Sequence, residues 1–151
     1  MKRLTLLAAG LAVAAATTAS AQSPFDMPVK ARQGAMAIIA VNLGILGDMA
    51  RGNTEYDAEA AQTAANSLAG VSMVDFPGLF VEGSDMANYD GTKAIAAIWE
   101  DMDGFAAEWA KVQTAAPALA EVAGNGAAEM GAALGAIGST CRACHSSYRG
   151  R

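Results

Sequence analysis

The chain has 151 residues, of which 53% are hydrophobic and 17% are charged, and its formal net charge is −5. This length indicates one domain with a single core. An acidic chain without a basic run is a poor match for the phosphates of nucleic acids or of an anionic membrane surface. We therefore expect neither as a partner.

The first 21 residues have the pattern of an export signal. Two basic residues follow Met1, residues 4–16 form an apolar run too short to span a bilayer, and residues 19–21 read Ala-Ser-Ala, a cleavage site. We expect cleavage after Ala21 and a mature domain of residues 22–151 in the bacterial periplasm. That domain has 8 basic and 15 acidic side chains, a net charge of −7. No further stretch of it is predicted to insert into a membrane.

Apolar residues recur every three or four positions in four later segments, which is typical of amphipathic helices. The first stripe covers residues 36–50, and the second covers 61–71 with Asp57 as a candidate N-cap. The third covers 98–119, after a preliminary turn at 94–99. Asp101 or Asp103 is its candidate cap, and Pro117 is expected to kink it or to mark an early end.

The fourth stripe covers residues 130–148, after a break at 124–126. The other connections are a polar turn at 51–54 and one long segment at 77–91. Four helices joined by two short connections and one long one predict an all-α fold, an antiparallel up-down-up-down four-helix bundle.

Cys141, Cys144 and His145 form the motif C-x-x-C-H, in a chain with two cysteines and one histidine. This spacing is the signature of covalent haem c attachment. The two thiols add to the vinyl groups of one porphyrin, and the histidine, one helical turn beyond Cys141, reaches the iron. Alternatives are a disulfide in an oxidising compartment, a thioredoxin-like redox pair and a zinc site. The helical setting disfavours the redox pair, and zinc lacks further ligands, so we predict one haem c.

The single histidine means that no second histidine binds the iron. Met36 on the first helix is the leading candidate for the opposite iron face, where it either bonds the iron or covers it as a core side chain. The sequence offers neither a distal histidine nor a paired acid and base. We therefore expect no enzyme.

Five stretches resemble the class II cytochromes c, and are most similar to cytochromes c′. They are ARQGAM, RGNTEYDAEAA, the LF of PGLFVEGSD, AAIWEDMDGFAAE and GSTCRACHSSYR, and they are distributed over nearly all of residues 29–149. The last is the most specific, because the tyrosine and arginine follow the haem motif directly.

The resemblance implies roles for nine residues. The haem-attaching cysteines and the proximal ligand correspond to Cys141, Cys144 and His145. Four further residues are implied near the haem propionates or edge: Arg32, Gln33, Thr92 and Lys93. Arg149 corresponds to an arginine on the proximal face that is associated with nitric oxide, and Met36 to the residue that covers the distal face.

Two functions follow from the resemblance. Cytochromes c′ have high-spin, five-coordinate iron that binds small diatomic gases such as NO and CO, or transfers electrons with a redox protein. In the related low-spin carriers, similar to cytochromes c-556 and c-554, a methionine at the place of Met36 is the sixth ligand. A homodimer is also expected, since Ile38, Val41 and Ile45 lie off the main stripe of the first helix.

Overall fold

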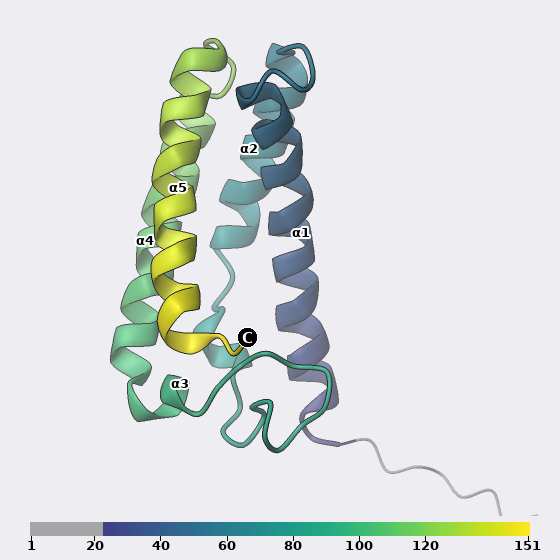
Figure 1. Ribbon diagram of the computed structural model, residues 1–151, viewed down its shortest axis with the longest axis vertical. Coiled ribbons are helices and arrows are strands. Elements are labelled where there is room, and N and C mark those ends of the chain that lie inside the picture. The colour runs from purple at the N-terminus through teal and green to yellow at the C-terminus, as the bar shows by residue number, and fades with distance from the viewer. Residues whose placement is uncertain (1–22) are drawn as a thin grey trace, which may run out of the picture.

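The computed structural model describes residues 23–151, so the expected signal segment at 1–21 lies outside the described residues. Four long helices form a bundle, and two short elements lie in the long connection (Figure 1). The long helices are α1 (Asp26–Ala50), α2 (Ala58–Ser72), α4 (Met102–Val122) and α5 (Ala127–Tyr148), and the short ones are η1 (Pro77–Leu79) and α3 (Ala97–Glu100).

Each long helix packs against two others. Helix α1 packs against α2 and α5, and α4 packs against the same two. Successive long helices run in opposite directions, as the colour gradient shows (Figure 1). The prediction of an all-α, antiparallel four-helix bundle is confirmed.

Two aspartates begin helices as the sequence predicts. Asp57 Oδ1 accepts from the Ala60 amide at 2.7 Å, and Asp101 Oδ1 accepts from the Gly104 amide at 3.1 Å. These bonds satisfy amides that the first helical turn leaves free. Asp101 is thus the cap of α4, while Asp103 lies in its first turn.

Helix α4 does not end at Pro117. It continues to Val122, so the expectation of an early end is wrong. A proline inside a helix removes one backbone donor. Its neighbours Ala116 and Leu119 are almost fully buried in the bundle core, and this packing holds the helix together past the proline.

One end of the bundle is tightly closed by small and aliphatic side chains. We call it the closed end; it contains the last turns of α1 and α4 and the first turns of α2 and α5. Tyr56 fastens it, because its hydroxyl donates to the Ala123 carbonyl at 2.8 Å and accepts from the Gly126 amide at 3.0 Å. Gly126 has a φ of 133°, which favours glycine at this turn. Six residues with no exposed surface form its core: Leu46, Ala61, Ala65, Leu119, Ala123 and Met130.

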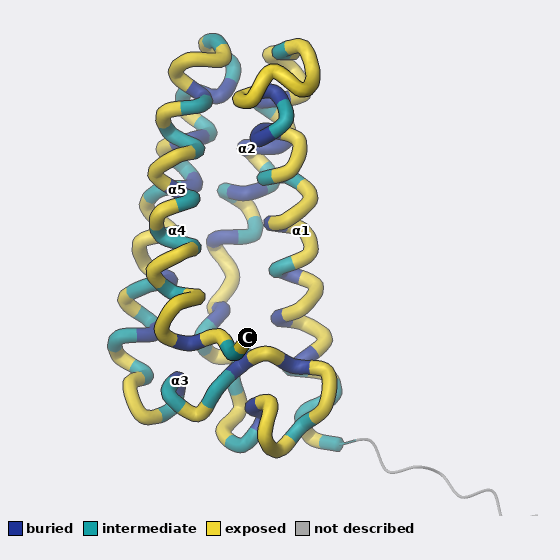
Figure 2. The backbone as a smooth tube through the Cα atoms, viewed as in Figure 1, coloured by how far each residue is buried: buried dark blue, intermediate teal, exposed yellow. Residues whose placement is uncertain are grey.

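Helix α1 has apolar residues on its outer face as well as its inner face. Ile38, Val41 and Ile45 remain 49%, 64% and 40% exposed, and much of the outer tube of α1 is yellow in Figure 2. By length and composition alone, α1 could therefore cross a membrane, which differs from the expectation that no stretch after the signal segment does. The same helix forms one wall of the bundle against α2 and α5.

Candidate haem site

The other half of the bundle surrounds a cavity of about 530 Å³, a size typical of cofactor pockets. Its walls come from α1, α4, α5, residues 91–94 and the two phenylalanines on either side of η1, with Leu68 of α2 and Ile98 of α3. All nine residues singled out in the sequence line it: Arg32, Gln33, Met36, Thr92, Lys93, Cys141, Cys144, His145 and Arg149.

Helix α5 brings both thiols to one wall of this cavity. Cys141 and Cys144 are free and half-buried rather than joined in a disulfide. Burial raises the pKa of Cys141, and it raises the pKa of Cys144 to about 11, with a further contribution from the carboxylate of Glu108. Both are therefore neutral thiols at physiological pH, held on adjacent turns of one helix.

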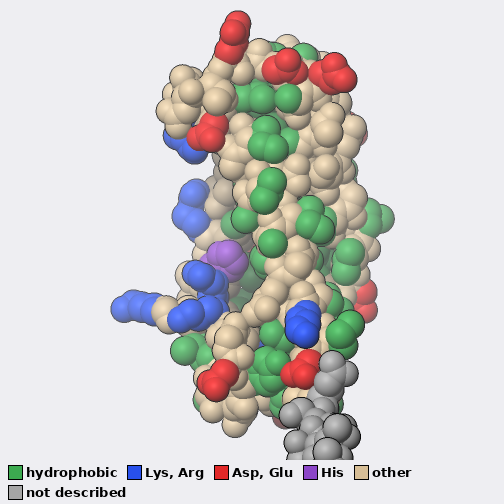
Figure 3. Space-filling model, turned by 90° about the vertical axis from the view of Figure 1, so that its right-hand side faces the viewer, with side chains coloured by type: hydrophobic (Ala, Val, Ile, Leu, Met, Phe, Trp, Pro, Cys, Tyr) green, Lys and Arg blue, Asp and Glu red, His purple; other side chains and the backbone are tan. Residues whose placement is uncertain are grey.

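His145 follows on the same helix at the open side of the cavity, where it is the single purple side chain of Figure 3. Partial burial of the ring and the nearby Arg149 cation both lower its pKa. The neutral imidazole is the form that binds metals.

Beyond Arg32 and Gln33, the wall on α1 is apolar. Met36, Ile39, Ala40 and Leu43 face the cavity, with no titratable side chain among them. An apolar wall excludes charged ligands, because a charge loses its hydration there without gaining a partner.

Aromatic rings form the floor between η1 and α4. Phe76 stacks on Trp109 with ring centres 4.4 Å apart, and Phe80 packs edge-on against Phe105 at 4.7 Å. Trp109 Nε1 donates to the Val74 carbonyl at 3.1 Å, which fixes the indole. The floor is therefore rigid as well as apolar.

Arg32 is a buried cation, only 4% exposed. Its guanidinium donates to Ser84 Oγ at 2.9 Å, to the Ser84 carbonyl at 2.6 Å and to Thr92 Oγ1 at 2.8 Å. It also lies 4.5 Å from the centre of the Phe80 ring. Burial lowers its pKa, although arginine stays protonated in proteins. Arg32 is therefore no solvated surface charge, and it ties α1 to the long connection.

Gln33 also joins α1 to the long connection, since its Nε2 donates to the Gly91 carbonyl at 2.7 Å. The chain end closes the same side. Ala94 and Arg149 form an isolated β-bridge, and the Gly150 amide donates to the Lys93 carbonyl at 2.8 Å. This pairing holds the exposed Lys93 and Arg149 side chains at the rim of the cavity.

Two residues of this region were missed by the sequence analysis. Ser84 is fully buried and accepts from Arg32, but it lies in a connection without a periodic pattern. Glu108 lines the cavity beside Trp109: Oε1 accepts from Lys111 Nζ at 2.5 Å, and Oε2 is buried without a partner among the described residues. The one sequence signal for Glu108 was its place at the edge of the apolar stripe of α4.

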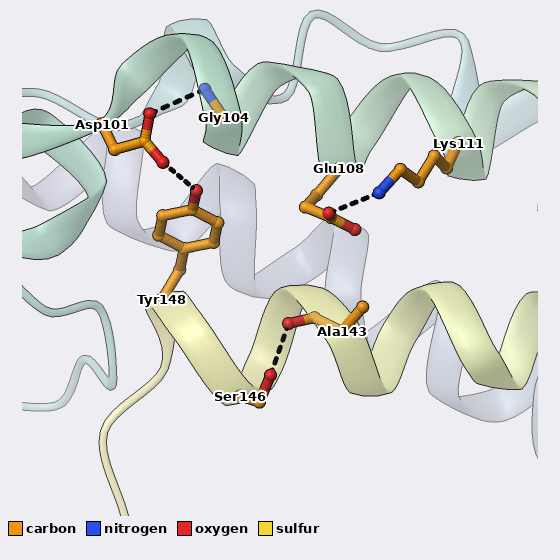
Figure 4. Close-up of polar contacts among 7 residues, drawn as sticks. All are labelled: Asp101, Gly104, Glu108, Lys111, Ala143, Ser146 and Tyr148. Atoms are coloured by element: carbon orange, nitrogen blue, oxygen red, sulfur yellow. Dashed lines mark hydrogen bonds and ion pairs between the residues drawn. The ribbon is translucent and has the colours of Figure 1, made fainter.

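Figure 4 shows how α4 and α5 are joined next to the cavity. Tyr148 Oη donates to Asp101 Oδ2 at 2.7 Å, while the other oxygen of Asp101 caps α4. This hydrogen bond raises the pKa of Tyr148 to about 12. It fixes the end of α5, and with it the motif, against the start of α4.

A family model described as Cytochrome C′ matches residues 27–149, which include every part of the cavity. The chain belongs to the cytochrome c′ family. That family includes standard examples of the up-down-up-down bundle.

Individual relatives agree with this assignment. Cytochrome c′ of Cereibacter sphaeroides is 37% identical over 91% of this chain and 92% of the relative. Cytochrome c-554 of the same organism is also 37% identical, over 80% of this chain and 91% of the relative. A relative named cytochrome c′ and a relative named cytochrome c-554 therefore have the same sequence identity to this chain.

Solved structures agree as well. Cytochrome c′ from Rhodobacter Spheriodes has a TM-score of 0.81 at 37% identity, covering 85% of this chain and 99% of the other. A nitric oxide complex of a mutant of cytochrome c prime from Alcaligenes xylosoxidans has a TM-score of 0.72 at 26% identity, covering 84% of this chain and 97% of the other.

Members of this family carry one covalently bound haem c, and the prediction of this cofactor is confirmed. The residues present fit it: one wall supplies two neutral thiols and an imidazole, and the remaining walls are largely apolar. The haem supplies an iron that changes oxidation state and binds axial ligands.

Proposed function

We propose that this chain is an exported, gas-binding haem protein in which Cys141 and Cys144 form the thioethers and His145 is the axial ligand. In this proposal the iron is high-spin and five-coordinate, and its open position takes a small uncharged diatomic such as NO or CO. Arg32, Gln33, Thr92 and Lys93 position the haem edge, and electron transfer with a redox protein is a companion role.

The observation that carries the proposal is the apolar part of the α1 wall, from Met36 to Leu43. Met36, Ile39, Ala40 and Leu43 present no hydrogen-bond donor or acid to a ligand. Such a wall admits neutral diatomic molecules and disfavours anions and hydrogen-bonded water. The nitric oxide complex of the Alcaligenes xylosoxidans relative supports the same ligand class.

Arg149 is proposed to act on the side of the cavity opposite to α1, where His145 lies. Arg149 follows His145 by four residues and lines the same cavity, and its cation, after burial of the ring, lowers the pKa of His145. If the haem is held by His145, the Arg149 guanidinium would stabilise a ligand bound on the His145 side. Substitution Arg149→Gln should then change NO binding more than CO binding.

Optical spectra of the ferric and ferrous protein, before and after CO addition, test the coordination. A broad high-spin ferrous band that shifts with CO supports an open position. Sharp low-spin bands that ignore CO would contradict it. The proposal assigns no catalysis, so turnover of peroxide or nitrite would also count against it.

The second candidate is a low-spin electron carrier in which Met36 is the sixth ligand. It is favoured by the thioether of Met36 on the cavity wall and by the equal identity to cytochrome c-554. In that case Met36→Leu should open the site to CO and lower the reduction potential, because thioether ligation raises it. In the five-coordinate case Met36→Leu leaves the spin state unchanged.

Export to the periplasm is proposed from the sequence of residues 1–21. Mass spectrometry of the purified periplasmic protein should give a chain that begins at Gln22. A haem-containing product that keeps Met1, or that is found in the cytoplasm, would contradict the export.

We also propose a homodimer through the outer face of α1. Ile38, Val41 and Ile45 lie on one face at spacings of three and four residues, and all three are exposed. Light scattering at micromolar concentration should give twice the chain mass, and Val41→Glu should give a monomer. Val81→Glu, at an exposed apolar residue outside α1, is the matched control.

A further inference from the structure

The chain has three tyrosines, and Tyr148 differs from the other two in its surroundings. Its ring is buried in the cavity wall, and its hydroxyl donates to Asp101 Oδ2 at 2.7 Å. Tyr89 also donates to a carboxylate, Asp26 Oδ1 at 2.7 Å, but it is not among the described residues that line the cavity. Tyr56 instead bonds backbone groups at the closed end. Tyr148 therefore combines a place beside the cofactor cavity with a carboxylate acceptor.

Helix α4 is shaped to hold this pair together. Figure 4 shows Tyr148 of α5 pointing at Asp101 where α4 begins, with Gly104 beside both. A Cβ atom at Gly104 would lie 2.6 Å from the Tyr148 hydroxyl oxygen, so a side chain at this position would displace the phenol. The Phe105 ring packs edge-on against the Tyr148 ring, with centres 5.2 Å apart. The phenol is therefore fixed in direct contact with its acceptor.

The two side chains differ in exposure, which gives the phenolic proton a way out. Tyr148 is 8% exposed, whereas Asp101 is exposed at the surface. A buried phenol gives up an electron more easily when its proton leaves at the same time, because no charged ring then remains in an apolar wall. Asp101 is a base within hydrogen-bond distance of that proton, which is the geometry that proton transfer requires.

We propose that Tyr148 is a redox-active tyrosine, which gives one electron to the haem site while its phenolic proton passes to Asp101. The inference rests on the proposed attachment of the haem at Cys141, Cys144 and His145, since these side chains line the same cavity as Tyr148. The oxidant is hydrogen peroxide. Tyr148 supplies one electron and becomes a neutral radical, and ferrous iron supplies the second and becomes ferric. The O–O bond breaks, and two protons from solvent complete two water molecules.

The electron from Tyr148 decides what the peroxide becomes. If iron alone supplied an electron, cleavage of the O–O bond would leave one hydroxide and one hydroxyl radical, which attacks nearby side chains. With the second electron from Tyr148, both oxygen atoms leave as water. The reaction stops after one peroxide because neither electron is replaced, so it is a protective step and not turnover.

The first test uses electron paramagnetic resonance. Ferrous protein is mixed with one equivalent of hydrogen peroxide and frozen rapidly. We expect a tyrosyl radical in the wild type, in Tyr89→Phe and in Tyr56→Phe, and no such signal in Tyr148→Phe. A tyrosyl signal that persists in Tyr148→Phe, or a wild type without one, would overturn the proposal.

A matched pair of variants tests the proton acceptor. Asp101→Asn keeps a good helix cap for α4, because asparagine caps as well as aspartate does, but its amide cannot take the proton. A general base contributes about a hundredfold or more to such a step, so Asp101→Asn should slow radical formation about a hundredfold. Asp26→Asn changes the acceptor of Tyr89 in the same way and should keep the wild-type rate. Equal rates for the two variants would overturn the role of Asp101.

A spin trap for hydroxyl radical tests the outcome of the reaction. Tyr148→Phe should release more trapped hydroxyl radical than the wild type, and equal amounts would overturn the protective step. Haem content and CO spectra of each variant are measured alongside. Wild-type protein without covalent haem would overturn the proposed function and this inference together. Normal haem content and a normal CO spectrum without a tyrosyl radical would overturn this inference alone.

Discussion

The same four helices pack closely at one end of the bundle and stand apart around a cavity in the other half. At the closed end, alanines such as Ala61, Ala65 and Ala123 let the helices approach closely, and nothing is left exposed in the core. In the other half, side chains from α1, α4 and α5 stand around a cavity of about 530 Å³. The closed end is complete by itself, whereas the cavity half is completed by its cofactor.

The difference shows where the stability of each half originates. Atoms that face a void have no dispersion partners on that side, so the cavity walls gain their contacts only when the cofactor is bound. Hydrogen bonds compensate for part of the missing dispersion contacts, since Arg32 and Gln33 join α1 to the long connection. The cofactor is therefore part of the core of the cavity half and does not contribute packing contacts at the closed end.

The largest expected effect comes from removing both attachment points. Cys141→Ser/Cys144→Ser keeps the side-chain size but cannot form thioethers. A ligand at about a thousandfold above its Kd stabilises a fold by about 4 kcal/mol, and we expect a loss of at least this size. Haem staining on a denaturing gel, together with thermal unfolding, measures it. Ser146→Ala on the same helix serves as the control, and a variant as stable as wild type would contradict the role of the cofactor as core.

A smaller effect is expected at the closed end. Met130→Ala leaves a void in place of a side chain with no exposed surface, and should cost about 2–5 kcal/mol of unfolding free energy without changing the haem spectrum. Leu43→Ala on the cavity wall should change the affinity for CO and have a smaller effect on the free energy of unfolding. Denaturant unfolding and CO titration of both variants decide this. If the two variants lost the same stability and bound CO equally well, the two ends of the bundle would not differ in function.

Breaking the tie made by Arg32 should cost less. Arg32→Met keeps an unbranched stem but leaves the oxygens of Ser84 and Thr92 without their donor, with an expected loss of about 2–3 kcal/mol. Lys30→Met, at an exposed position two residues earlier, is the control and should be nearly neutral. Equal stability of the two variants in denaturant would show that the tie contributes nothing.

The smallest effect depends on pH. The pKa of Tyr148 is raised to about 12 by its bond to Asp101, above its ordinary value of 10.0. The neutral phenol is favoured in the folded state, so this contribution is complete below pH 10 and is lost as the pH rises from 10 to 12. Denaturation midpoints should fall more steeply over this range in the wild type than in Tyr148→Phe. Tyr56→Phe, which removes the hydroxyl bonded to the Ala123 carbonyl and the Gly126 amide, is the control for the loss of a tyrosine hydroxyl.

Much of the fold could be read from local patterns. The period of apolar residues located the four helices, and Asp57 and Asp101 marked helix starts, because capping involves residues only three positions apart. The C-x-x-C-H motif located one wall of the site for the same reason. For Pro117, the alternative of an early helix end was wrong, since α4 continues past it and its neighbours Ala116 and Leu119 pack in the core.

The parts that could not be predicted depend on residues far apart in the chain. Arg32 and Ser84 are 52 positions apart, and no periodic pattern connects them. Gln33 meets Gly91 across 58 positions. Family resemblance gave Arg32 a place near the haem, but its buried bonds became visible only in three dimensions. Homodimer assembly, spin state and the roles of individual site residues stay predictions.

The short pairing between the chain end and residues 93–94 has a consequence for the motions of the molecule. The Gly150 amide donates to Lys93, and the Met86 amide donates to Ala94, so two backbone protons flank the segment that borders the cavity. Neither proton can exchange with solvent until that segment separates from its neighbours. Deuterium uptake at the Gly150 and Met86 amides therefore measures how often this side of the pocket opens, with no probe attached to the protein and no ligand added.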